Sequence, residues 1–216
     1  MPRTRWGAEA PEDASAAKGR LVDAAAACFE RYGVTKTSVE DIATEAHVSR
    51  ATVYRYFEGG RDELVLCVGL REVRRFAGEV QRRTARQATV ADGIVEGIML
   101  TVRAVQERPT LALLFTQDTA GYTEALVGGS DALHAETIRF LEPMLDEAKR
   151  QGAIRGDVAV GDAAEWFIRV VMSLATMPSR RRPADQRRLL REYFVPAFLP
   201  ADGAARQTAR TRDGHR

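Results

Sequence analysis

The residues between Arg50 and Phe57 combine side chains that can bind double-stranded nucleic acid. In a helix, residues 53 and 57 would face a core, whereas residues 51, 52, 54 and 55 would share the other side. On that side an Arg guanidinium can donate two hydrogen bonds to guanine, methyl groups can contact thymine, and hydroxyls can bind phosphate. No acidic residue lies between positions 50 and 57. The pattern predicts a helix that contacts DNA through Ala51, Thr52, Tyr54 and Arg55.

Two hydroxyl caps and a short turn would position this helix. Ser38 is a favourable N-cap, and Asp41 three residues later completes a capping-box pattern. Apolar residues at helical spacing between positions 39 and 46 then form one stripe of a short helix. The chain turns at residues 47–48, and Ser49 caps the next helix. A helix, a short turn and a second helix over residues 38–57 form the unit that places its second helix in a DNA major groove.

Four stretches of the chain follow one another in a known order and spacing. They are Leu21-Val-Asp-Ala-Ala through Phe29, Tyr32-Gly33, Thr37-Ser38-Val39-Glu40-Asp41-Ile42-Ala43, and Val48-Ser49-Arg50-Ala51-Thr52-Val53-Tyr54-Arg55-Tyr56-Phe57. Over about residues 15–70 the chain resembles the TetR family of transcriptional regulators. The length, a long fourth helix and an all-helical remainder also match that family. The resemblance implies a homodimer that binds a palindromic operator.

The resemblance also implies roles for individual side chains at the DNA. It places phosphate contacts at the start of the second helix and on the two tyrosines of the third, and Arg61 matches a position where the family usually has Lys. Residues 50, 51, 52 and 55 would face base edges or flanking phosphates. The candidate DNA-binding residues are Thr37, Ser38, Ser49, Arg50, Ala51, Thr52, Tyr54, Arg55, Tyr56 and Arg61.

Two positions depart from the family pattern. The turn between the two helices usually contains Gly, and here it contains His47. This position tends to need a positive φ, which His tolerates better than most residues other than Gly, so slight strain is expected. The family's Pro/Asn-Ser-Lys after Phe57 is replaced by Glu-Gly-Gly-Arg over residues 58–61. The two glycines are expected to loosen the corner before the fourth helix.

The chain is predicted to be all-α. A flexible arm over residues 1–14 precedes a DNA-binding domain over 15–75, followed by an effector-binding and dimerisation domain over 76–199 and a disordered tail over 200–216. The fourth helix is expected at about 61–87. Pro and Gly positions divide the larger domain into helices at about 90–106, 110–117, 121–127, 131–151, 160–177 and 184–198.

The larger domain is expected to hold the dimer surface and a ligand pocket. In the TetR family the last two long helices of each chain form a four-helix bundle in the dimer. The corresponding helices here are expected over residues 160–177 and 184–198. The helix over 160–177 is apolar around more than half its circumference, as a helix buried on two sides requires. The candidate ligand-binding residues, chosen for apolar or adaptable side chains, are Met99, Val102, Phe115, Leu141, Met144, Trp166 and Met172.

Composition and motifs limit the other functions that the chain could have. Residues 1–60 hold 8 Lys and Arg against 9 Asp and Glu, so bulk charge does not argue for nucleic acid and the argument rests on the outward residues. No catalytic constellation, cofactor motif, metal-ligand spacing, signal peptide or membrane span is visible. We expect a cytoplasmic, non-enzymatic repressor released by a small, largely apolar molecule. The alternatives are an activator, a ligand-independent regulator or, in another class, a helical protein-interaction scaffold.

Overall fold

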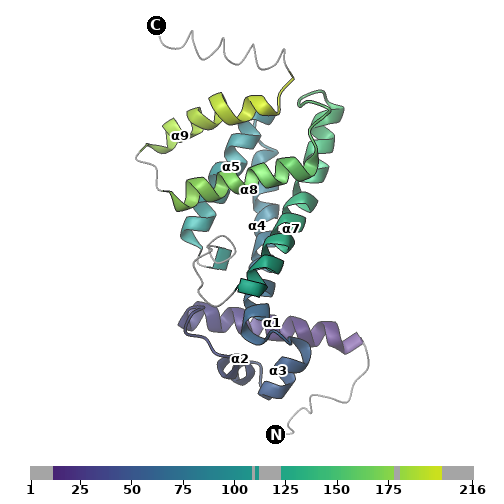
Figure 1. Ribbon diagram of the computed structural model, residues 1–216, viewed down its shortest axis with the longest axis vertical. Helices are drawn as coiled ribbons and strands as arrows, with labels where there is room; N and C mark the ends of the chain where they lie inside the picture. The colour runs from purple at the N-terminus through teal and green to yellow at the C-terminus, as the bar shows by residue number, and fades with distance from the viewer. Residues whose placement is uncertain (1–11, 109, 112–122, 178–180, 201–216) are drawn as a thin grey trace. The chain divides into compact units, whose positions relative to one another are not determined.

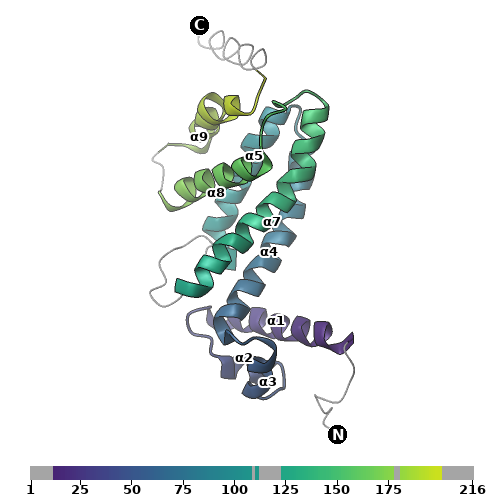
Figure 2. The same ribbon diagram turned by 45° about the vertical axis from the view of Figure 1, so that its right-hand side comes forward.

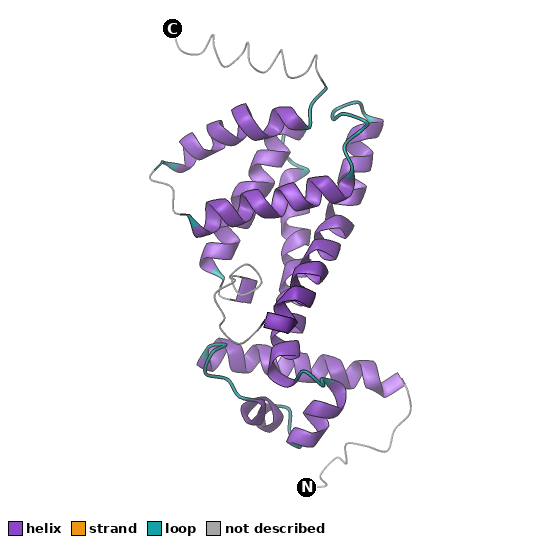
Figure 3. Ribbon diagram, viewed as in Figure 1, coloured by secondary structure: helices purple, strands orange, loops and turns teal. Residues whose placement is uncertain are grey.

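The computed structural model describes residues 12–108, 110–111, 123–177 and 181–200. Every regular element in these ranges is a helix, as Figure 3 shows, so the predicted all-α class is confirmed. The chain divides into two compact units. Unit 1 contains Met1–Glu72 and Thr110–Ser130, and unit 2 contains Val73–Pro109 and Asp131–Arg216. No helix in the described ranges is long and apolar enough to cross a membrane.

Unit 1 is built on three helices and the beginning of a fourth. They are α1 (Glu12–Tyr32), α2 (Val39–Glu45), α3 (Arg50–Tyr56) and the first half of α4 (Gly60–Thr84), seen in the purple and blue part of Figure 1. Each helix contributes a side chain that is fully buried in one shared core: Leu21, Ile42, Val53 and Leu64. This shared core holds α3, which has only seven residues and is too short to be stable in isolation.

Unit 2 contains the second half of α4 with α5 (Val90–Glu107), most of α7 (Thr123–Arg150), α8 (Val160–Thr176) and α9 (Pro183–Leu189). Helices α5 and α8 pack against each other, and Figure 2 shows α7 beside the second half of α4. The buried carboxylate of Glu136 on α7 pairs with Arg74 on α4 and with Arg139. Hydrogen bonds from both guanidiniums outweigh the burial of this carboxyl group and lower its pKa.

Two expected boundaries are wrong. Helix α1 begins at Glu12, inside the arm expected over residues 1–14. Helix α7 runs unbroken from Thr123 to Arg150, so the break expected at Gly128-Gly129 does not occur and the two helices expected at 121–127 and 131–151 are one. Each Gly lowers helix stability by about 1 kcal/mol relative to Ala, which a long helix can absorb. The helix expected at 110–117 lies mostly outside the described residues.

The last expected helix, over residues 184–198, is not a single α-helix. It is α9, then a π-helical turn over Leu190–Phe194, then a 3₁₀ turn over Val195–Ala197. Pro196 has no N–H to donate to the carbonyl four residues earlier, so the α-helical hydrogen-bond ladder cannot continue through it. The change of helix type decides where the side chains of Phe194 and Phe198 point.

Candidate nucleic-acid interface and effector cavity

Both helices of the helix-turn-helix begin with the predicted caps. The Ser38 Oγ accepts a hydrogen bond from the Asp41 N–H at 3.2 Å, and the Asp41 carboxylate accepts one from the Ser38 N–H at 2.8 Å, which completes the capping box. The Ser38 hydroxyl also donates to this carboxylate at 2.6 Å, and this bond, together with the bond from the Ser38 N–H, lowers the pKa of Asp41. The Ser49 Oγ accepts a hydrogen bond from the Thr52 N–H at 3.1 Å and also lies 3.0 Å from the Thr52 hydroxyl. The first turns of α2 and α3 are therefore held by local hydrogen bonds.

The turn between α2 and α3 is a Schellman motif with His47 at its left-handed position. The N–H of His47 donates to the Thr44 carbonyl at 3.1 Å, and the N–H of Val48 donates to the Ala43 carbonyl at 2.9 Å. His47 has a φ of 57°, so the positive φ expected at the position where the family usually has Gly is present. A residue with a Cβ is strained in this region, whereas Gly is not.

Replacing His47 with Gly is expected to stabilise the protein. Removal of the Cβ relieves the left-handed strain, and part of this gain is lost to the greater chain entropy of Gly, so the net increase in the free energy of unfolding is about 0.5–1 kcal/mol. Urea denaturation measures it. His47→Val is the matched contrast, because a β-branched residue at positive φ must lower the stability. Equal stabilities of the three proteins would contradict the assigned turn geometry.

The outward side of α3 is accessible. Ala51, Tyr54 and Arg55 are exposed, whereas Val53 on the opposite side is fully buried. The guanidinium of Arg55 lies 4.9 Å from the centre of the Tyr56 ring and donates to the Tyr56 hydroxyl at 3.4 Å. The Tyr56 ring itself packs on the unit 1 core. The Tyr56 ring thus orients the Arg55 side chain, and the guanidinium remains at the surface.

At the entrance to α3, Arg50 is also exposed. It lies 3.5 Å from the Glu40 carboxylate of α2, with 60% of the Arg50 side chain exposed. An exposed pair of this kind contributes little to stability and exchanges readily with other partners. A phosphate group can therefore replace Glu40 as the partner of Arg50 at small cost.

The two glycines after α3 form a close contact instead of a loose corner. Gly60 has a φ of 60°, and a Cβ at this position would lie 2.8 Å from Cε1 of Tyr54. The N–H of Gly60 donates to the Phe57 carbonyl at 2.8 Å, and the N–H of Gly59 donates to the Glu63 carboxylate at 3.1 Å. The expectation of a loosened corner is wrong, because the Tyr54 ring packs where a side chain on residue 60 would lie.

Gly60→Ala is expected to weaken both folding and DNA binding. The methyl group strains the backbone at positive φ and displaces the Tyr54 ring, at a cost of about 1–3 kcal/mol in the free energy of unfolding. Thermal unfolding and operator binding by fluorescence anisotropy measure the two effects. Gly19→Ala is the control, because a Cβ at that position in α1 meets nothing within 4 Å. A Gly60→Ala protein as stable as the parent would show that the Tyr54 contact does not form.

Two of the candidate DNA-binding residues point inward. The hydroxyl of Thr37 is 2% exposed and lies within hydrogen-bond distance of the Gly33 and Cys28 carbonyls, at 2.9 and 3.3 Å. The Arg61 guanidinium donates to the Thr37 carbonyl at 2.7 Å and to the Val34 carbonyl at 2.6 Å. Both side chains hold the segment between α1 and α2, so the expected phosphate contacts from these two side chains are not supported by their placement.

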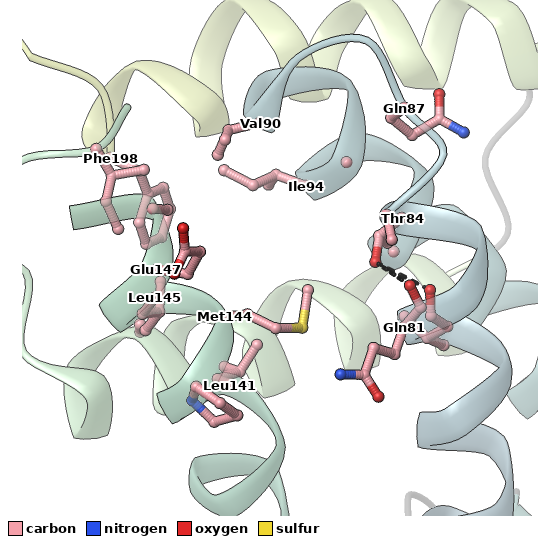
Figure 4. A pocket seen from close by; sticks show the side chains of 18 of the residues that line it. Gln81, Thr84, Gln87, Val90, Ile94, Leu141, Met144, Leu145, Glu147 and Phe198 are labelled. Carbon is pink, nitrogen blue, oxygen red and sulfur yellow. Dashed lines mark hydrogen bonds between the residues drawn. The ribbon is translucent and has the colours of Figure 1, made fainter. Parts of the chain in front are cut away.

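Unit 2 contains a cavity of about 600 Å³ (Figure 4). It is lined by the end of α4, the following loop, the beginning of α5, the second half of α7, and parts of α8 and the C-terminal turns. Its walls carry the rings of Phe140, Phe167, Phe194 and Phe198, and amide groups lie at Gln81, Gln87 and Gln151. The volume is in the range usual for small-molecule sites.

Of the candidate ligand-binding residues that the structure describes, two line this cavity, namely Leu141 and Met144 on α7. Val102 on α5 is buried in the hydrophobic core. Trp166 on α8 is 47% exposed and stacks on Phe194 at a centroid distance of 6.0 Å. Met99 and Met172 are half-buried away from the cavity, and Phe115 lies outside the described residues. The four phenylalanines were missed, although their spacing along the last helices was visible in the sequence.

Several large apolar side chains of the expected dimer helices are exposed in the single chain. They are Trp166 and Met177 of α8 and its C-cap, at 47% and 70%, and Tyr193 of the π-helical turn, at 77%. Large apolar side chains that are exposed on helices expected to dimerise are compatible with a surface that binds another protein. The dimer surface stays a prediction, because the structure contains one chain.

Comparison with known proteins identifies the family. Residues 21–68 match the sequence model of the bacterial regulatory proteins of the tetR family. An uncharacterised HTH-type transcriptional regulator of Mycobacterium tuberculosis is 31% identical over 191 residues, which cover 88% of this chain and 90% of the relative. The chain belongs to the TetR family. It is therefore a transcriptional regulator that binds DNA through its helix-turn-helix, and the predicted family assignment is confirmed.

Solved structures share the fold of this regulator at low sequence identity. RolR in complex with resorcinol aligns with a TM-score of 0.66 and 16% identity over 93% of this chain and 97% of RolR. FadR of Thermus thermophilus in complex with lauroyl-CoA aligns with a TM-score of 0.56 and 20% identity over 81% of this chain and 92% of FadR. At these identities the alignments establish the fold alone.

Proposed function

We propose that this TetR-family regulator is a homodimeric repressor. It binds a palindromic operator through α3 and leaves the DNA when a small, largely apolar molecule occupies the unit 2 cavity. The observation that carries the proposed operator contact is the outward side of α3. Ala51, Tyr54 and Arg55 are exposed there, and the helix contains no acidic residue. Arg50, Thr52 and Tyr56 flank these residues, and the N-caps Ser38 and Ser49 lie at the helix ends that face phosphate in helix-turn-helix complexes.

Release by a ligand is supported by the cavity and by two proteins of the same fold. RolR is known with resorcinol, and FadR of Thermus thermophilus with lauroyl-CoA. The second half of α4 lines the cavity, and the first half of the same helix belongs to the DNA-binding unit. A ligand releases the operator only if it binds the released conformation more tightly than the DNA-bound one. A regulator of this kind acts on the chromosome in the cytoplasm and needs no catalytic group.

The first experiment is binding of the purified protein to duplex DNA from immediately upstream of its own gene. Fluorescence anisotropy is recorded over a salt series with a scrambled duplex as competitor. The expected result is binding that resists the competitor and weakens as salt rises. If neither this duplex nor any sequence from a genome-wide selection binds better than the scrambled duplex, the operator-binding proposal is wrong. A promoter-reporter assay then separates a repressor, whose deletion raises expression, from an activator, whose deletion lowers it.

The dimer is tested at Tyr193. Because 77% of this side chain is exposed in the single chain, Tyr193→Glu leaves the fold of the protomer intact and places a charge in the proposed interface. We expect the variant to sediment as a monomer at micromolar concentration and to lose operator binding, since one α3 reads too few base pairs. Arg103→Ala, which also lowers the net charge by one and lies at an exposed position of α5, is the control for the change of charge. A Tyr193→Glu protein that remains dimeric would place the interface elsewhere.

A further inference from the structure

We propose that the unit 2 cavity selects an uncharged molecule that contains aromatic rings and one hydrogen-bonding group, and that it rejects anions. This inference rests on the proposed function, because it names the chemical class of the effector. It is argued from the walls of the cavity, from the charges on its lining and from one amide group whose bonding capacity is not used.

The walls are unusually rich in aromatic rings. The chain contains eight Phe residues, and four of them line this cavity: Phe140 on α7, Phe167 on α8, and Phe194 and Phe198 in the C-terminal turns. The ring of Phe194 contacts two other rings, stacked on Trp166 at a centroid distance of 6.0 Å and tilted against Phe198 at 5.1 Å. Rings fixed in this way present their faces and edges to another ring, a contact worth more than the burial of apolar area alone.

The charges on the lining disfavour an anion. None of the described residues that line the cavity is Lys, Arg or His, and the one charged side chain among them is Glu147. Glu147 pairs with Arg150 and accepts a hydrogen bond from the Gln151 amide at 2.5 Å, so its charge is compensated within α7. A carboxylate or phosphate in this cavity would lose its water without gaining a cationic partner, and it would lie near a carboxylate. A neutral ligand avoids both costs.

One polar group in the lining is available for a ligand. The exposed Gln81 side chain extends from α4 toward the Met144 side of the cavity (Figure 4), and its amide forms no hydrogen bond with another of the described residues. The neighbouring Thr84 hydroxyl is already used, because it donates to the Val80 carbonyl at 3.0 Å. The Gln81 amide offers an acceptor oxygen and two donor hydrogens, which suit a single phenol, aniline or carbonyl group.

A matched pair of fluorescent probes tests the selection. Anilinonaphthalene is uncharged at neutral pH and has three aromatic rings in all with one N–H donor, and anilinonaphthalene sulfonate differs only by its anionic group. We expect the full-length protein to bind one neutral probe per chain, and to bind the sulfonate about tenfold or more weakly because the anion has no partner. Met144→Trp places a larger side chain in the space that the probe would occupy and should abolish binding of the neutral probe while the circular dichroism spectrum is unchanged.

Gln81→Lys supplies the cation that the lining lacks. It should reverse the preference, raising the affinity for the sulfonate by about tenfold and lowering that for the neutral probe. Gln106→Lys is the control, because residue 106 is exposed on α5 outside the cavity and should leave both affinities unchanged.

The outcomes distinguish this inference from the proposed function. Preference of the parent protein for the sulfonate, equal binding of both probes, or binding that survives Met144→Trp would each overturn the inference about ligand class. None of these results affects operator binding, which is measured separately by anisotropy. If the parent protein binds no duplex better than the scrambled one, the proposed repressor function is wrong, even if the cavity binds the neutral probe as expected.

Discussion

Arg55→Ala should strongly weaken specific operator binding while leaving the protein folded. A bidentate contact between Arg and guanine contributes about 1–3 kcal/mol to discrimination between bases. A symmetric dimer contains two such contacts, so affinity for the operator should fall by at least about 30-fold, while the weak binding to scrambled DNA changes far less. The loss should appear as relaxed specificity at one base pair in each half-site. Anisotropy with operator and scrambled duplexes measures both affinities.

The control for Arg55→Ala must remove the same charge without touching α3. Arg103 on α5 is suitable, because its side chain is 73% exposed and pairs with Glu107 on the same helix. Arg103→Ala should bind the operator as the parent does. Truncation of Arg55 also removes its contact with the Tyr56 ring, so the melting temperature is recorded for both variants. Unchanged operator specificity in a folded Arg55→Ala protein would remove α3 from the proposed reading surface.

Arg61→Ala should lower the stability of the protein, and this prediction separates two interpretations of the residue. The resemblance to the TetR family suggests a phosphate contact, whereas the structure shows the guanidinium bonded to the Val34 and Thr37 carbonyls with 20% of its side chain exposed. Loss of two hydrogen bonds from a charged donor costs about 3 kcal/mol. For a chain of this length the melting temperature should fall by about 6–12 °C. Differential scanning calorimetry measures this change.

Two further variants make the test of Arg61 decisive. Arg61→Lys keeps the charge but cannot reach both carbonyls at once, so it should lose about half as much stability. Arg50→Ala also removes a cation near the expected DNA, but its exposed pair with Glu40 makes the stability change smaller than about 0.5 kcal/mol. If Arg61→Ala instead reduces the salt dependence of DNA binding with no change in melting temperature, the residue contacts phosphate and its assigned structural role is wrong.

The local features of the helix-turn-helix were predictable because their hydrogen bonds join residues at most five positions apart. The capping box of Ser38 and Asp41, the cap at Ser49 and the positive φ of His47 each follow from a residue type and its immediate neighbours. The corner at Gly60 was not predictable in this way. It depends on the Tyr54 side chain, whose ring packs against Gly60.

The cavity was harder to predict because helical spacing does not distinguish a core residue from a cavity residue. Val102 and Leu141 are both apolar residues at helical spacing, yet the first is buried in α5 and the second lines the cavity. The position of Phe194 depends on the π-helical turn that precedes Pro196, and this turn rotates the following side chains relative to an α-helix. Residues on six segments must be placed before the space between them can be seen.

The sequence by itself determined the family, the all-helical class and the side of α3 that faces outward, because these depend on periodicity and on residues near one another in the chain. The tertiary structure alone decided that Arg61 binds carbonyls 24 and 27 positions away, that Thr37 is buried, and that four phenylalanines surround one cavity. Such contacts depend on how helices pack, and side chains far apart in sequence carry no local signal of their partners. The DNA-reading helix is therefore encoded locally, whereas the effector cavity exists only in the folded unit.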